Sequence, residues 1–244
     1  MTECIDLSDY DYMDFPLPLL CVGWLGRDHG IQQGNQPPMS REVVDAFERA
    51  SLRVVSRTLG EHDCAFCPEE AAATGNGEYR YYAHDGLTYT APVMVRHYVR
   101  DHGYRLPAPL QQSLLDTRPL PWDTRAERLA GLVADPAEDI IARCLAVSDL
   151  VHWQDRRTVD ALELAALDEE LVDLVGREIG RSLKEALEGT PGAQLSTNEG
   201  DFPLEVRAGL VGDRRDPAGQ ARQSNRDRPR QVRFPSSSRR AGDG

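Results

Sequence analysis

Apolar residues in the first half of the chain come in short runs that predict strands and brief helices. Residues 17–26 form a continuous apolar run bounded by prolines and glycine, which predicts a buried strand. Ser40 precedes apolar residues at helical spacing, as an N-cap would, and predicts a short helix over residues 41–51. Val54 and Val55 suggest a further strand that leads toward a group of cysteines.

A hairpin followed by a helix is predicted next. Asp85-Gly86 lies between two aromatic, β-prone runs, residues 78–82 and 87–90, and this pattern is a strong hairpin signal. Pro92 suits the first turn of a helix, and Gly103 suits its C-terminal end. The first folded unit should end near residue 115.

The second half changes to helical periodicity alone. It contains two pairs of helices, of which the first breaks at Asp135 and the second at Asp168, thirty-three residues later. Two helical hairpins at that offset resemble a pair of HEAT-like repeats. The helices are expected over residues 124–134, 137–151, 158–167 and 169–188.

Three segments follow from this pattern. We expect an α+β domain at 1–117, an all-α, HEAT-like segment at 122–189, and an Arg-rich tail at 190–244. The stretch Arg118-Pro119-Leu120-Pro121 reads as a stiff linker. The tail has few apolar residues to offset its ordering entropy, so it is predicted to be disordered.

Charge disfavours a conventional nucleic-acid reader. The net charge is −12, yet residues 201–244 hold ten arginines against six acids, so the first 200 residues carry −16. Such an acidic body repels phosphate backbones. Only the tail, through Arg222, Arg226, Arg228, Arg230 and Arg233, is a candidate for binding nucleic acid.

Composition and cysteine use predict a cytoplasmic bacterial protein. Lys184 is the only lysine among 28 basic residues, a skew typical of GC-rich genomes. The N-terminus is acidic where a secretory signal would be basic, and no apolar run is long enough to span a bilayer. With five cysteines in a reducing cytoplasm, Cys-x-x-Cys indicates metal or redox chemistry, and Cys21 reads as a core thiol.

The most specific chemical pattern is a possible zinc site. Cys64 and Cys67 are spaced as Cys-x-x-Cys, and His97 and His102 follow near the end of the predicted helix. Two thiolates and two imidazoles are the ligands of a structural, tetrahedral zinc ion. The 29 residues between Cys67 and His97 exceed the roughly twelve of a DNA-reading finger, so the resemblance extends to the metal site alone.

The geometry leaves the fourth ligand open. Histidines five residues apart point roughly 140° away from each other on an ideal helix. Both can bind one ion only if the last turn unwinds, which Gly103 permits, and His62 is the alternate or second-shell ligand. Two other interpretations are a redox pair and ordinary buried thiols.

Several short motifs together resemble an uncharacterised bacterial family. They are Val22-Gly23-Trp24-Leu25-Gly26, His62-x-Cys64-x-x-Cys67, Gly75-Asn76-Gly77-Glu78, and Ala91-Pro92 leading to His97-Tyr98-Val99 and His102-Gly103-Tyr104. The family is a domain of unknown function, seen mostly in actinobacterial hypothetical proteins, and the resemblance covers about residues 5–115. It implies a small α+β domain with a metal knuckle and carries no activity with it.

The sequence therefore favours a zinc-stabilised module, without catalytic activity, that binds an as yet unidentified protein partner and no membrane. Helical repeats usually recognise proteins, and no catalytic motif is recognised. The alternative is a metal-dependent hydrolase that uses His62 or Glu78 beside an ion with one open position. Nucleic-acid binding by the tail arginines is a third hypothesis.

Overall fold

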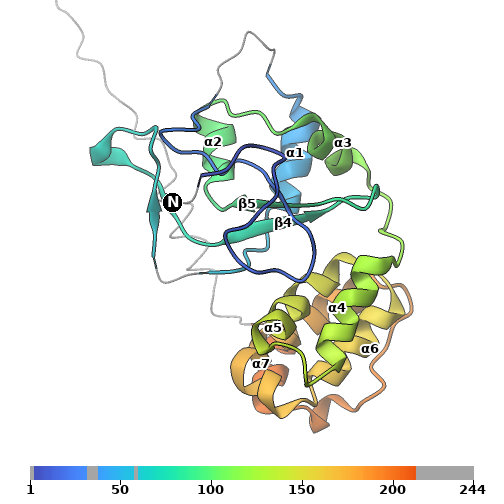
Figure 1. The fold of residues 1–244 in the computed structure, drawn as a ribbon. Coiled ribbons are helices and arrows are strands. Elements are labelled where there is room, and N and C mark those ends of the chain that lie inside the picture. Colours follow the sequence, from blue (N-terminus) through green and yellow to red (C-terminus); the bar gives the residue numbers. More distant parts are fainter. Residues whose placement is uncertain (1–2, 32–37, 58–59, 213–244) are drawn as a thin grey trace, which may run out of the picture. The chain divides into compact units, whose positions relative to one another are not determined.

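The computed structural model describes residues 3–31, 38–57 and 60–212. The described residues up to Val211 form one compact unit. Small sheets and helices occupy its first half and helices alone the second, so the predicted α+β class is confirmed (Figure 1).

A three-stranded sheet lies at the centre of the first half. Its order is β1 (Leu20–Cys21), β5 (Thr88–Pro92), β4 (Glu78–Tyr82), with β1 parallel to β5 and β4 antiparallel to it. Every residue of β4 and β5 is buried. A second, two-stranded sheet pairs β2 (His62–Asp63) with β3 (Thr74–Gly75).

The turn between β4 and β5 forms as predicted. Gly86 has φ of +90°, a conformation that glycine adopts without steric cost. The Asp85 side chain accepts a hydrogen bond from the Leu87 N–H at 3.0 Å. The Asp-Gly pair thus fixes the register in which Tyr81 faces Tyr89.

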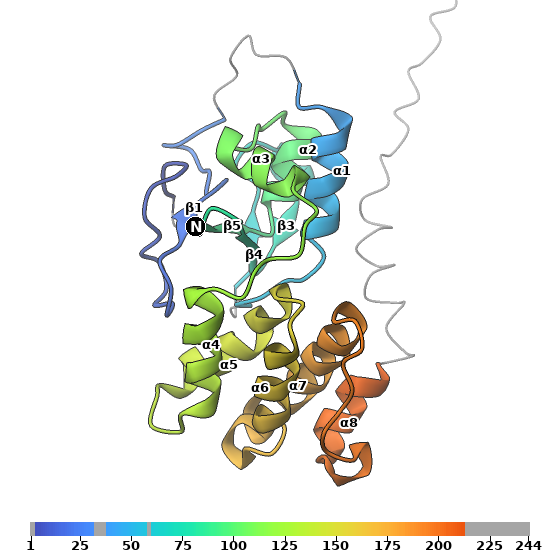
Figure 2. The same cartoon turned by 90° about the vertical axis from the view of Figure 1, so that its right-hand side faces the viewer.

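Three helices lie on one face of this sheet (Figures 1 and 2). They are α1 (Arg41–Ala50), α2 (Val95–Asp101) and α3 (Ala108–Leu115). Ser40 caps α1 by accepting a hydrogen bond from the Val43 N–H, as predicted. Gly103, with φ of +69°, follows the end of α2.

Four helices of the second half lie where the apolar periodicity predicts them. They are α4 (Thr124–Ala134), α5 (Ile140–Asp149), α6 (Arg156–Ala165) and α7 (Glu169–Gly189), the last bent at Val175. An aspartate caps the N-terminus of each by accepting backbone N–H bonds. Helix α4 packs on α5 and α6, and α7 packs on α5 and α6.

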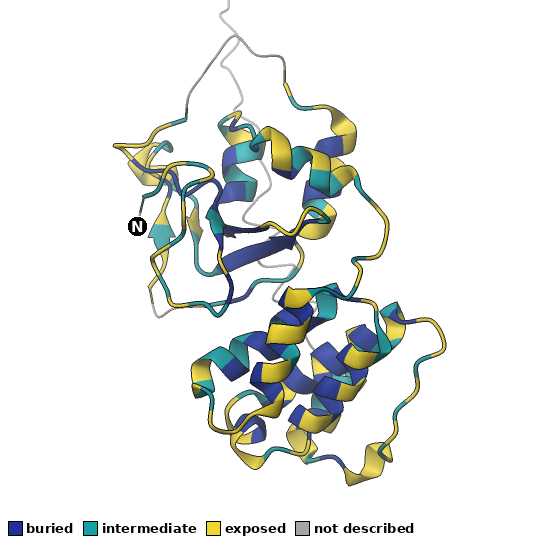
Figure 3. Ribbon diagram, turned by 45° about the vertical axis from the view of Figure 1, so that its right-hand side comes forward, coloured by how far each residue is buried: buried dark blue, intermediate teal, exposed yellow. Residues whose placement is uncertain are grey.

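Two hydrophobic clusters form the core, as the dark blue ribbon in Figure 3 indicates. One is built around the sheet and α1–α3, and the other around α4–α7. Leu17 and Tyr82 from the first half belong to the second cluster. Arg125 of α4 donates to the carbonyls of Leu87 and Ala83 at 2.6 and 2.7 Å, and so bonds the hairpin to the helices.

Two elements of the first half differ from prediction. The run 17–26 is largely buried, but only Leu20–Cys21 forms a ladder, because Pro18 lacks an N–H and Gly23 turns the chain at φ of +68°. Pro92 ends β5 and does not begin a helix. Its missing N–H is tolerated at this strand end, where the chain turns into α2.

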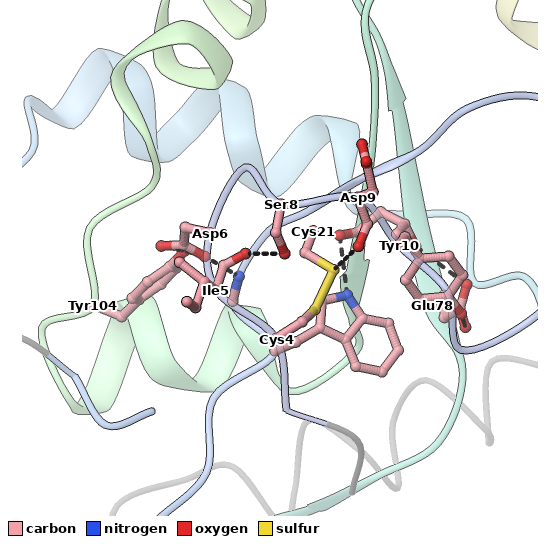
Figure 4. The surroundings of a disulfide bond; sticks show 12 residues. Cys4, Ile5, Asp6, Ser8, Asp9, Tyr10, Cys21, Glu78 and Tyr104 are labelled. Atoms are coloured by element: carbon pink, nitrogen blue, oxygen red, sulfur yellow. Dashed lines mark hydrogen bonds between the residues drawn. A yellow bond between two sulfur atoms is a disulfide. The ribbon is translucent and has the colours of Figure 1, made fainter. Parts of the chain in front are cut away.

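Cys21 is not the free core thiol that the sequence suggested. It is fully buried, yet it forms a disulfide with Cys4, seventeen residues earlier (Figure 4). Disulfide connectivity cannot be deduced from one sequence, and Cys4 lies in an acidic segment without periodicity.

The boundary of the predicted disordered tail also differs. Residues 190–212 include the 3₁₀ turn η3 (Glu199–Asp201) and helix α8 (Leu204–Val211), which packs on α7. Phe202 and Val206 are buried in the helical core despite the polar composition around them. The arginines proposed to bind nucleic acid, 222–233, lie outside the described residues.

Glycines set how closely α8 approaches α7. A Cβ on Gly180 would lie 2.9 Å from Gly209 Cα, and one on Gly209 would lie 2.8 Å from the Arg181 nitrogen. The two backbones are therefore in direct contact, which apolar periodicity cannot predict.

Membrane insertion through a helix finds no support in the described ranges. None of the helices there combines the length and the apolar character that crossing a bilayer requires.

Gly180→Ala is expected to destabilise the protein by about 1–3 kcal/mol, because the new methyl group must separate α7 from α8. The matched control is Gly131→Ala, at an exposed position of α4 where a Cβ meets nothing within 4 Å. Urea unfolding should show the control as stable as the natural protein or slightly more so. Equal midpoints for the two variants would contradict the close contact.

Candidate metal centre

Four side chains from two separate segments converge on one point. Cys64 directly follows β2, and Cys67 precedes the 3₁₀ turn η1 (Glu69–Ala71). His97 lies within α2, and His102 is the residue that ends it. These are the four ligands named from the sequence, and one ligand atom from each lies within 4.8 Å of all the others.

The spacing of these atoms suits a small tetrahedral ion. Nε2 of His102 lies 3.3 Å from Cys64 Sγ, 3.4 Å from Cys67 Sγ and 3.0 Å from His97 Nε2. Cys67 Sγ lies 3.2 Å from His97 Nε2. Zinc bonds of about 2.3 Å to sulfur and about 2.0–2.1 Å to nitrogen place neighbouring ligand atoms roughly 3.3–3.8 Å apart. The arrangement could therefore close around a metal ion with little movement.

Both histidines reach the same point because the helix ends between them. Helix α2 stops at Asp101, and His102 leaves helical geometry with φ of −119° and ψ of 1°. Gly103 then adopts a left-handed conformation, and the Tyr104 N–H bonds back to the Tyr98 carbonyl at 3.0 Å. Because the helix ends here, His97 and His102 no longer point away from each other as they would on an ideal helix.

Asp101 orients His97 and was missed from the sequence. Its Oδ2 lies 2.7 Å from His97 Nδ1, and Arg100 holds the same carboxylate at 2.8 Å. The bonds from Arg100 are the main reason that the pKa of Asp101 lies below its usual value. A carboxylate on Nδ1 directs Nε2 toward a metal and raises its basicity. The sequence signal that could have identified Asp101 is its position four residues after His97, which places both side chains on one helix face.

The sulfur ligands lie in a partly dry environment. Cys64 is buried, and this burial raises the pKa of its thiol, while the backbone N–H groups of Phe66 and Cys67 oppose the rise. Phe66 donates its N–H to Cys64 Sγ at 3.4 Å, and its ring packs on Tyr98 and His102. For His102, burial is the main cause of a lowered pKa, which favours the neutral, metal-binding imidazole.

His62, the alternate ligand, does not join this group. It pairs with Gly75 in the small sheet, and its side chain lines a separate cavity of about 20 Å³ together with Glu78 and Trp24. That volume accommodates about one water molecule. Glu78 is itself buried and accepts hydrogen bonds from Tyr10 and Thr90. The two residues that the hydrolase hypothesis places beside the ion therefore lie outside the metal group.

An open depression of about 530 Å³ borders the candidate centre. It is lined by Gly30, Ile31, Phe66, Asp101, His102 and Gly103. Of the four ligands only His102 contributes to its wall. A solute could thus approach the centre from the side of His102.

Comparison with known proteins yields a family assignment for part of the chain and no activity. Neither a curated protein nor a solved structure matches it. The predicted resemblance to an uncharacterised family is confirmed over the segment that contains all four candidate ligands: residues 2–115 match the family described as a domain of unknown function (DUF7919).

Proposed function

We propose that the protein is a zinc-stabilised interaction module without catalytic activity. The observation that carries the proposal is the complete Cys64, Cys67, His97 and His102 ligand set, already spaced for one tetrahedral ion. Structural zinc sites use four protein ligands, whereas catalytic sites keep one position for water or substrate.

The metal would serve the fold by joining two weakly held elements. The knuckle of residues 64–67 follows a strand of only two residues, and the small sheet of β2 and β3 contributes little buried surface. An ion bound to both cysteines and both histidines would tie this knuckle to α2. Binding free energy then becomes folding free energy for this part of the chain.

The helical segment supplies the proposed binding surface. Helices α4–α7 pack on one another, and we interpret them as the predicted HEAT-like hairpins, whose usual role is to bind proteins. Several large apolar side chains on these helices are more than half exposed, so they lie outside the core and can contact a partner. They are Ile141, Leu164 and Leu174, and Leu167 is similarly exposed in the turn between α6 and α7.

A metal-dependent hydrolase is the second candidate, and one observation favours it. The depression beside His102 gives a small molecule access to one side of the centre. Against it, His62 and Glu78 line a different cavity and offer no general base at the metal. We therefore rank this function below the structural role.

The first prediction concerns metal content. Mass spectrometry should find one zinc ion per chain in the natural protein and no zinc in the double variant Cys64→Ser/Cys67→Ser. Loss of the metal should lower the free energy of unfolding by about 3 kcal/mol or more, because binding is coupled to folding. Cys144→Ser, which changes a free cysteine of α5, is the matched control and should keep its zinc. A stable, metal-free natural protein would refute the structural site.

The second prediction separates a closed site from an open one. The cobalt-substituted protein should show the intense visible absorption of a tetrahedral, sulfur-containing site, and this spectrum should not change when azide or phosphate is added. A shift of the spectrum with added anion would show an open position and support the hydrolase.

The third prediction concerns the exposed apolar side chains. Leu164→Glu/Leu174→Glu should leave thermal unfolding nearly unchanged, because surface substitutions usually alter stability by about 0.5 kcal/mol or less. In pull-downs, the variant should no longer bind proteins that bind to the natural chain. Leu52→Glu, at an exposed position outside the helical segment, is the control and should retain them. Identical retention by all three proteins would refute this surface.

A further inference from the structure

We infer that the Cys4–Cys21 disulfide is a redox latch that holds the loop of residues 26–31 against the metal centre. This inference rests on the proposed zinc site. We call residues 3–10 the N-terminal strap and residues 26–31 the covering loop.

The disulfide fastens the strap along β1 (Figure 4). Leu7 donates its N–H to the Cys21 carbonyl at 2.8 Å, and the Cys21 N–H bonds to the Ser8 carbonyl at 2.9 Å. The Asp6 carboxylate accepts from the Tyr104 hydroxyl, in the segment just after the metal-binding helix. The strap is thus anchored at its centre by hydrogen bonds, while Cys4 anchors its beginning covalently.

Glu3, next to Cys4, carries this anchoring into the covering loop. Its carboxylate accepts hydrogen bonds from the backbone N–H groups of three consecutive residues, Arg27, Asp28 and His29, at 2.9–3.1 Å. The His29 N–H is the leading cause that lowers the pKa of Glu3. Gly26 lies so close that a Cβ there would overlap the same carboxylate. Glu3, which belongs to the N-terminal strap, thereby fixes the conformation of the covering loop.

The covering loop in turn packs beside the metal ligands. A Cβ on Gly30 would lie 3.8 Å from the Phe66 ring, which is ordinary van der Waals contact. Phe66 stands between the two metal-binding cysteines in sequence, and its ring centroid lies 5.7 Å from that of His102. Gly30 and Ile31 also line the same depression as His102 and Asp101. A loosened loop would therefore widen the access to the centre.

The chemistry of the latch is dithiol–disulfide exchange. Cys21 is fully buried, whereas Cys4 is partly exposed, so a thiolate of an external dithiol would attack Cys4 Sγ. The Cys21 thiolate leaves and takes up a proton. The second thiol of the reductant then attacks the mixed disulfide, which releases Cys4 as a thiol and the reductant as a cyclic disulfide. Two electrons pass to the protein, and a small-molecule disulfide reverses the exchange.

The test compares the zinc-loaded natural protein with three variants under non-reducing conditions. Cys4→Ser opens the latch, Gly26→Ala displaces Glu3 while the disulfide stays intact, and Cys144→Ser is the control. Amide hydrogen exchange at residues 27–29 reports on the covering loop. The rate at which a chromophoric chelator, 4-(2-pyridylazo)resorcinol, extracts zinc reports on the centre.

We expect both Cys4→Ser and Gly26→Ala to speed exchange at residues 27–29 and zinc extraction on the order of tenfold, with no change in the control. Unchanged exchange at residues 27–29 in Cys4→Ser would refute the latch. Faster exchange with unchanged extraction would refute its link to the centre. Absence of zinc from the natural protein would instead refute the proposed function, and the exchange data would still test the latch.

Discussion

The buried guanidinium of Arg80 imposes the strongest constraint on how this chain can fold. A charge removed from water must be paired, because an unpaired one costs several kcal/mol. Arg80 lies on the central hairpin and pairs with Asp149 at the end of α5, and both are almost completely buried. It also donates a hydrogen bond to the Ser56 hydroxyl, and its Cζ lies 3.9 Å from the centroid of the Phe15 ring. The hairpin, the N-terminal segment and the helical segment must therefore all be in place before this charge is satisfied.

That requirement explains why two hydrophobic clusters form one compact unit. Each half could bury its own apolar face, as the separate clusters around the sheet and around α4–α7 show. The polar contacts of Arg80 and Arg125 then fix how the hairpin meets the helices, because a guanidinium donates only in its own plane. Apolar surface supplies the driving force, and these two arginines supply the specificity.

Sequence reasoning succeeded wherever a local signal determines the geometry. Asp85-Gly86 defined the hairpin turn, Ser40 defined the start of α1, and the periodicity of residues 124–134 matched α4 from end to end. The four residues of the candidate metal centre also came from local spacing. Their convergence required only that a hairpin return the chain and that α2 end before His102.

Prediction from the sequence failed where the conformation of a segment depends on residues far away in the chain. Helix α8 is stabilised by backbone contact at Gly180 and by burial of Phe202 and Val206, none of which polar composition reveals. The disulfide pairs Cys4 with Cys21 because the N-terminal strap runs along β1, and the spacing of the cysteines in the sequence does not reveal this path. Arg80 lies two residues from Glu78 on β4, but it hydrogen-bonds to Asp149, sixty-nine residues away.

The way α2 ends has a consequence for recognising such centres in other chains. Two histidines with four residues between them are a usual spacing for zinc ligands, although an ideal helix would point them away from each other. Here a residue that binds no metal, Gly103, makes the pair usable by ending the helix one position before the second histidine. The information for coordination therefore resides partly in backbone conformation. Searches for similar centres would gain from a pattern that reads His-x₄-His-Gly as one unit, with the glycine counted alongside the ligands.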